Sequence, residues 1–149
     1  MTDAPETFDD LIRRVDPDRW LASRFIGDAQ ARAGVIALYA FNDELARIAP
    51  AVTNPLMGEI RLAWWREALD EIAEGRVVRR HPVAEALAQL VRRSAMDMDG
   101  LYGLVEARAA DLEPGPFADD AALLGYLDAT AGALMALAAE VLGAPGAAA

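Results

Sequence analysis

The 149-residue sequence contains no cysteine and no lysine, and it has a single histidine. The absence of cysteine excludes disulfide bonds, cysteine-ligated zinc and thiol catalysis, and it fits a reducing compartment. All 14 basic residues are arginine, against 24 acidic residues, so the formal net charge is -10. Nucleic-acid binders need clustered cations to neutralise phosphates, and we therefore expect no nucleic-acid partner.

Targeting signals and long apolar runs are also scarce. Residues 1–10 are acidic and lack the basic region and apolar core of a secretory signal, which predicts a cytoplasmic location. The longest apolar run, residues 129–142, is interrupted by Glu140 and is shorter than the roughly 20 residues of a membrane-spanning helix. We therefore predict a buried helix there and no transmembrane segment.

Alanine is abundant, and glycine and proline cluster between apolar segments with a three- or four-residue repeat. This pattern favours an all-α fold of about six helices without strands. Asp16 with Pro17, Asp28, and His81 with Pro82 have the residue types of helix starts. The expected helices cover about residues 17–26, 29–49, 56–73, 82 to beyond 91, 97–112 and 119–142. No linker is evident, so residues 1–149 are predicted to form a single helical domain.

Several short motifs follow one another in a fixed order. They are Arg-Ala-Gly-Val-Ile-Ala-Leu-Tyr-Ala-Phe at residues 32–41, Trp-Arg-Glu-Ala-Leu at 65–69, His-Pro-Val at 81–83, Asp-Leu at 111–112, and Tyr126 with Ala-Gly at 131–132. Together they resemble the squalene and phytoene synthase family. The resemblance implies the first portion of an isoprenoid-synthase-type helical bundle. It also implies these pocket-lining candidates: Tyr39, Asp111, Tyr126, Ala131 and Gly132.

The same resemblance shows where the sequence departs from the synthases. Their first substrate-binding helix leads into an aspartate-rich Mg²⁺ motif, whose metal-binding positions fall here on Ala46, Arg47 and Pro50. None of these side chains can hold Mg²⁺. The second acidic helix of the family would lie beyond Leu142. We therefore expect the N-terminal part of a longer family domain, with no metal site and no cofactor.

The neighbouring acids do not replace the lost motif. Ionising an allylic diphosphate normally requires Mg²⁺ held by carboxylates from two facing helices. Asp43 and Glu44 are adjacent and point about 100° apart on a helix, so they cannot converge on one ion as an i,i+4 pair would. Asp43 precedes Arg47 by four residues, which predicts a surface ion pair.

The Asn-Asp-Glu-Leu-Ala sequence at residues 42–46 resembles the family branch that contains a respiratory complex I assembly factor. This likeness implies a non-catalytic protein that binds a protein partner or an isoprenoid-like lipid in respiratory complex assembly. Peripheral membrane contact and a homodimer are further expectations.

Two other functions stay open. One is an active Mg²⁺-dependent prenyltransferase that condenses two prenyl diphosphates head-to-head. In that case Tyr39, Asp111 and Tyr126 would be surviving pocket residues, and a C-terminal half would supply the missing carboxylates. The other is a plain helical interaction module without a lipid pocket.

Some candidates also have purely structural interpretations. Tyr39 and Tyr126 fit core residues with hydrogen-bonded hydroxyls, and His81 fits a helix cap better than a catalytic base. Of Trp64 and Trp65, which are adjacent on one helix, we expect one indole to be buried and the other to be partly exposed.

Spacing makes further predictions for the charged and apolar residues. Arg61 and Arg66 are expected to pair with acids of their own helix. Asp111 and Glu106 are expected to form a solvated acidic face. One helix face is predicted to carry Leu56, Ile60, Trp64 and Ile72.

Overall fold

The structure is a computed structural model that describes residues 6–113 and 115–144. Within these residues the chain is helical and contains no strand, so the all-α prediction is confirmed. The α-helices are α1 (Phe8–Val15), α2 (Pro17–Ser23), α3 (Ala29–Ala46), α4 (Pro55–Ala73), α5 (Pro82–Arg93), α6 (Met98–Ala107), α7 (Asp120–Leu127) and α8 (Ala133–Val141). Three short helical segments join them: η1 (Ala49–Ala51), η2 (Arg108–Leu112) and η3 (Asp128–Gly132).

Side-chain caps fix most of the predicted helix starts. Asp28 accepts a hydrogen bond from the backbone N–H of Ala31 at 2.7 Å, at the start of α3. Asn54 does the same for Leu56 at 3.0 Å, at the start of α4. Each cap satisfies a backbone donor that has no partner inside the helix. For this reason α3, α4 and α5 begin close to where the sequence predicts.

The first helix, α1, is absent from the sequence prediction. It begins with a capping box in which Thr7 Oγ1 accepts from the N–H of Asp10 at 3.1 Å, while the Asp10 carboxylate accepts from the N–H of Thr7 at 3.3 Å. The usual capping box has Glu or Gln in the third position, and Asp takes that role here. The acidic character of residues 1–10 obscured this start signal. Residues 1–5 lie outside the described part of the chain.

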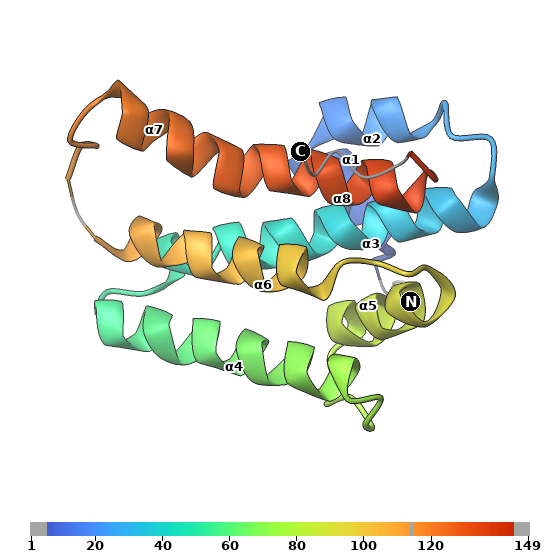
Figure 1. Cartoon of the computed structure of the whole chain (residues 1–149), viewed down its shortest axis with the longest axis horizontal. Helices are drawn as coiled ribbons and strands as arrows, with labels where there is room; N and C mark the ends of the chain where they lie inside the picture. The colour runs from blue at the N-terminus through green and yellow to red at the C-terminus, as the bar shows by residue number, and fades with distance from the viewer. Residues whose placement is uncertain (1–5, 114, 145–149) are drawn as a thin grey trace, which may run out of the picture.

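The last helix is longer and more exposed than predicted. α7, η3 and α8 run without interruption over Asp120–Val141, 22 residues. In Figure 1, α7 lies at the upper left, and α8 continues the helix to the right, below α2. By length and composition alone this helix could cross a membrane, but the core helix of a soluble protein can meet the same criteria. The absence of such a segment was predicted from the run at residues 129–142, which is shorter than this helix. Only 22% of its apolar window is buried. The buried helix predicted for residues 129–142 is confirmed only in part: Leu134, Leu137 and Ala138 are buried, whereas Ala131, Gly132 and Met135 are exposed.

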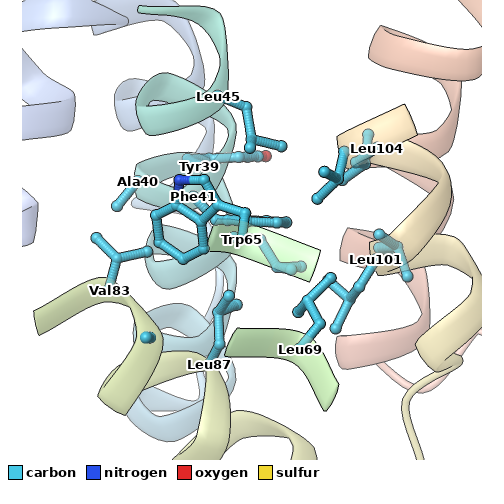
Figure 2. Packing of buried hydrophobic residues seen from close by; sticks show 14 of the residues in the cluster. Tyr39, Ala40, Phe41, Leu45, Trp65, Leu69, Val83, Leu87, Leu101 and Leu104 are labelled. Atoms are coloured by element: carbon cyan, nitrogen blue, oxygen red, sulfur yellow. The ribbon is translucent and has the colours of Figure 1, made fainter. Parts of the chain in front are cut away.

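The core forms around α3, which lies in the middle of the bundle (Figure 1). Figure 2 shows Phe41 of α3 beside Trp65 of α4, with Leu101 and Leu104 of α6 approaching from the other side. The two aromatic rings meet edge to face with centroids 5.1 Å apart, a preferred geometry. Burial of each such large side chain stabilises the fold by about 1.5–3 kcal/mol. α3 therefore holds its polar residues at fixed positions relative to α4 and α6.

Candidate functional site

A polar cluster joins three elements that are far apart in the sequence. Arg108 of η2 donates from Nη2 to Oδ1 of Asn42 in α3 at 2.9 Å. Its Nη1 donates to Asp111 Oδ2 at 3.1 Å and lies 3.2 Å from the hydroxyl of Tyr126 in α7. The Tyr126 hydroxyl in turn donates to Asp111 Oδ1. The structure thus brings together two predicted site residues, Asp111 and Tyr126, with Asn42 and Arg108, which were not predicted as site residues.

In this cluster the charge of Asp111 is compensated by the guanidinium of Arg108 and by a hydrogen bond from the Tyr126 hydroxyl. Burial raises the pKa of Tyr126 above its usual value, and the hydrogen bond to the Asp111 carboxylate adds to this rise. Arg108 and Asp111 have side chains that are 13% and 23% exposed. The Nε of Arg108 is buried and has no hydrogen-bond partner within the described residues. Arg108 therefore neutralises Asp111, and the cluster has no pair of unpaired carboxylates that could bind a cation.

The predicted solvated acidic face is thus wrong. Asp111 is tied to Arg108 and Tyr126, whereas Glu106 forms an ion pair with Arg66 of α4. This pair joins α6 to α4, so Arg66 also differs from its prediction, which placed its partner on its own helix. Residues 40 positions apart meet because α4 and α6 pack side by side (Figure 1).

Tyr39 lies in the core with 8% of its surface exposed. Its ring faces the guanidinium of Arg19 from α2, whose Cζ is 5.9 Å from the ring centroid. Burial raises the pKa of the Tyr39 hydroxyl. The predicted burial of Tyr39 is confirmed, but its hydroxyl takes part in none of the hydrogen bonds found among residues 6–113 and 115–144. A role in lining a lipid pocket stays a prediction.

Ala131 and Gly132 lie in η3, a π-helical turn inside the long last helix. Both residues are exposed. Thr130, beside them, is buried and donates from Oγ1 to the carbonyl oxygen of Tyr126 at 2.7 Å. π-Helical turns often occur at functional sites. The bulge changes the direction of side chains just after Tyr126, and no feature of residue spacing predicts it.

The three positions that carry metal ligands in the synthases hold no ligands here. Ala46 ends α3, Pro50 is exposed in η1, and Arg47 is 55% exposed at its side chain. Arg47 Nε lies 2.9 Å from Asp43 Oδ2, and its Nη2 donates to Glu44 at 2.6 Å. The predicted Asp43–Arg47 ion pair is confirmed. It is a charge contact, because Asp43 Oδ2 accepts no well-aligned hydrogen bond within the described chain.

Mg²⁺ does not fit this arrangement. Hard divalent cations bind several oxygen ligands, and here the two acids at the end of α3 both face a guanidinium. Over residues 6–113 and 115–144 no group of three or more acidic or histidine side chains is close enough to hold a metal ion. A methyl, a guanidinium and a proline ring occupy the family's ligand positions.

A pocket of about 400 Å³ opens beside Arg47, between the end of α3, α4 and the start of α5. Its aromatic wall consists of Trp64, Trp65 and His81. The His81 ring lies 5.3 Å from Trp64 and 5.1 Å from Trp65, centroid to centroid. Trp65 is 4% exposed and Trp64 is half-buried, as predicted for the adjacent pair.

His81 is a helix cap, as predicted. Its Nδ1 accepts a hydrogen bond from the N–H of Val83 at 3.3 Å, at the start of α5. Sequence reasoning did not anticipate that this ring would also contact both indoles, whose own centroids are 4.9 Å apart. Only the packing of α4 against the start of α5 brings the three rings together.

Similarity to known proteins identifies the family of this chain. The model of the Squalene/phytoene synthase family matches residues 12–149. The chain belongs to this family. Its similar relatives are described as "NADH dehydrogenase (ubiquinone) complex I, assembly factor 6". The protein from Bos taurus is 30% identical over 134 residues, and that from Homo sapiens is 29% identical over 134 residues. A homolog from Dictyostelium discoideum is 27% identical over 135 residues.

These matches cover 90% of this chain but 40% of the mammalian relatives, and 91% against 38% for the Dictyostelium homolog. The chain thus spans about two fifths of the length of these relatives. Family membership accounts for the ordered motifs in the sequence. The structure places Asn42, in the Asn-Asp-Glu-Leu-Ala segment, at the polar cluster with Arg108. That segment, together with the motifs that contain Asp111 and Tyr126, was the sequence signal for this cluster.

Proposed function

We propose that this protein is a non-catalytic member of the squalene/phytoene synthase family that acts in respiratory complex assembly by binding a protein partner. The observation that carries the proposal is the state of Arg47. This residue occupies a family metal-ligand position and forms ion pairs with Asp43 and Glu44, the two acids nearest to it. The relatives described as complex I assembly factors support a role in respiratory complex assembly.

The physical argument concerns the leaving group. A departing diphosphate carries several negative charges, which Mg²⁺ ions held on carboxylates normally neutralise. The acids at the end of α3 are already compensated by Arg47, so a metal ion would have to displace a guanidinium 2.6–2.9 Å away. A single cation on this helix cannot match the charge of two Mg²⁺ ions. Binding without turnover is therefore the function that this geometry favours.

The test combines a binding and a turnover measurement. The purified protein is titrated with Mg²⁺ and a non-hydrolysable farnesyl diphosphate analogue, and is then incubated with Mg²⁺ and farnesyl or geranylgeranyl diphosphate. We expect no metal-dependent binding and no condensed product, with an active squalene synthase as the positive control. Mg²⁺-dependent formation of a head-to-head product would establish the rival function, a prenyltransferase with its missing carboxylates supplied elsewhere.

An isoprenoid-like lipid or a membrane surface is a second candidate ligand, and one observation favours it. The helix Asp120–Val141 is apolar and mostly unburied, and Leu124 and Leu127 on it are 59% and 44% exposed. Exposed apolar patches commonly mark protein or membrane contacts. Flotation with neutral phosphatidylcholine vesicles tests this: co-migration that Leu124→Gln abolishes would favour lipid contact over a protein partner alone.

A further inference from the structure

The aromatic pocket beside Arg47 has features of a recognition site for a peptide. Trp64 supplies a half-buried indole and His81 supplies a ring whose Nδ1 already accepts the N–H of Val83. The neutral imidazole therefore carries its proton on Nε2, which remains as a donor. Indole and imidazole side by side form an apolar wall with one polar group. Such walls are typical of sites that receive a single anchoring side chain.

Apolar residues extend this wall along α4. Leu56, Met57 and Ile60 are 63%, 49% and 54% exposed. At 100° per residue, these three positions together with Arg61 and Trp64 fall within an arc of about 140° on one side of the helix. We call this set of five residues the α4 stripe. α4 forms the lower edge of the molecule in Figure 1, so the stripe lies at the surface.

The exposure of the stripe departs from the sequence prediction. Leu56, Ile60, Trp64 and Ile72 were predicted to share one face, yet only Ile72 is buried. The buried face of α4 is instead the one that carries Gly58, Leu62, Trp65 and Leu69. The helix is turned so that its first two turns present large apolar side chains to solvent. Trp, Met and Arg together are typical of protein interfaces.

Charge identifies the chemistry of the occupant. The arginines that border the stripe, Arg47, Arg66 and Arg79, each contact at least one carboxylate within 3.2 Å. Arg61 also lines the pocket and is exposed, but it takes part in none of the ion pairs found in residues 6–113 and 115–144. The predicted pairing of Arg61 with acids of its own helix is therefore wrong. Glu44, an acid that lines the same pocket, is paired with Arg47 at 2.6 Å. Arg61 is thus a cation at the rim of an aromatic pocket without an ion-pair partner among the described residues. A carboxylate of a partner would complete the pair.

We propose that the α4 stripe and the Trp64–His81 pocket bind a peptide segment of a protein partner in which an acidic residue flanks an aromatic or large aliphatic side chain. The apolar side chain fills the pocket against Trp64, and the carboxylate meets Arg61. This inference rests on one part of the proposed function, namely that the ligand is a protein. The prenyl diphosphate assay above judges the proposed function separately.

The experiment selects ligands without assuming a partner. The purified chain is used to select from a library of random linear peptides displayed on phage, and the enriched peptides are resynthesised. We expect Asp or Glu within two positions of Phe, Tyr, Trp or Leu in the enriched sequences. Binding of the best peptide, followed by calorimetry, should weaken at least about tenfold in Arg61→Glu and in Trp64→Ala.

The controls separate recognition from folding. Arg92→Glu makes the same charge change on the exposed surface of α5 and should bind within about twofold of wild type. Because Trp64→Ala removes part of the core rim, Arg61→Glu at an exposed position is the decisive variant, with its fold checked by circular dichroism. Tight binding by Arg61→Glu would overturn the proposal, as would an absence of enriched peptides or a consensus that is basic or uncharged.

Other occupants of the stripe give distinct results. If the surface joins two copies of this chain, sedimentation velocity will show a dimer that Ile60→Glu dissociates. If it contacts lipid, flotation with phosphatidylcholine vesicles will depend on Leu56 and Ile60. Either result overturns the peptide proposal.

Discussion

Arg108 donates a hydrogen bond from Nη2 to Oδ1 of Asn42 at 2.9 Å, although 66 residues separate them in the sequence. The contact joins η2, which follows α6, to the later part of α3. Because the same guanidinium also reaches Asp111 and the Tyr126 hydroxyl, one side chain holds α7 in place beside α3. α7 has no buried residues of its own, so this network is one of the contacts that hold it, together with the continuation of the same helix into the packed α8.

The Arg108→Met variant tests this role. It keeps most of the aliphatic volume but leaves Asn42, Asp111 and Tyr126 without their shared donor. Asp111 is partly hydrated, so we expect a loss of about 1–3 kcal/mol in the free energy of unfolding, measured with urea. Arg92→Met, at an exposed position of α5, should stay within about 0.5 kcal/mol of wild type. Equal losses in the two variants would show that the network contributes nothing beyond side-chain packing.

Two glycines in α6 make a matched pair. A Cβ added at Gly100 would lie 2.8 Å from Leu137 Cδ2 of α8, whereas one added at Gly103 would meet no atom within 4 Å. Leu137 is 2% exposed and has little room to move. Gly100→Ala should therefore destabilise the protein by about 1–3 kcal/mol through overpacking. Gly103→Ala should stabilise it by about 0.5–1 kcal/mol, since alanine is the better helix former.

Thermal unfolding of both variants, each compared with wild type, measures the difference. The expected shifts in Tm have opposite signs. A Gly100→Ala variant as stable as Gly103→Ala would mean that α6 and α8 separate easily, and that the close approach of the two helices contributes little.

The Glu71–Arg79 pair predicts how stability responds to acid. Hydrogen bonds from the side chain and backbone of Arg79 lower the pKa of Glu71 from 4.5 to about 2. A carboxyl whose pKa is depressed by folding stabilises the protein above its unfolded pKa and loses that contribution as the pH falls. The wild-type free energy of unfolding should therefore decline between pH 4.5 and about pH 2 in part through Glu71.

Glu71→Gln removes that part of the decline. We expect the variant to be less stable than wild type at neutral pH and to approach it as the pH falls toward about 2, in urea unfolding at a series of pH values. Glu59→Gln, at an exposed position on the same helix, is the control and should leave the decline unchanged. A difference between Glu71→Gln and wild type that does not vary with pH would mean that the charge of Glu71 has no part in the effect.

Residues at the helix ends predicted where the helices lie. They did not predict which residues far apart in the sequence come into contact. The starts of α3, α4 and α5 were predictable because each is set by a cap within three residues of the helix. The polar cluster was not, because Arg108 meets Asn42 only after α3 and α6 have packed. The rotation of α4, which exposes Ile60 and buries Trp65, likewise depends on which face its neighbours cover. Residue spacing gives the faces of a helix but not which of them turns inward.

The last helix is partly buried along α8 and largely exposed along α7, and substitutions in the two parts should therefore differ in their effect on stability. Leu134 in α8 is fully buried, and Leu124 in α7 is 59% exposed. Leu134→Ala should cost about 2–5 kcal/mol, because it removes apolar contacts and leaves a cavity. Leu124→Ala should change stability by no more than about 0.5 kcal/mol. Urea unfolding of the two variants measures both values, and a large loss in Leu124→Ala would show that another surface covers α7 in solution.

A second copy of this chain, as in the homodimer expected from the sequence, is one surface that could cover α7. Leu123, Leu124 and Leu127 are 38%, 59% and 44% exposed on α7, and burying them between two copies would stabilise a dimer in proportion to the apolar area removed from water. In that case sedimentation velocity should show association that rises with protein concentration and weakens in Leu124→Gln. Arg92→Gln, a polar change on α5, should leave it intact. Association that persists in Leu124→Gln would place the dimer contact elsewhere and leave α7 free for another partner.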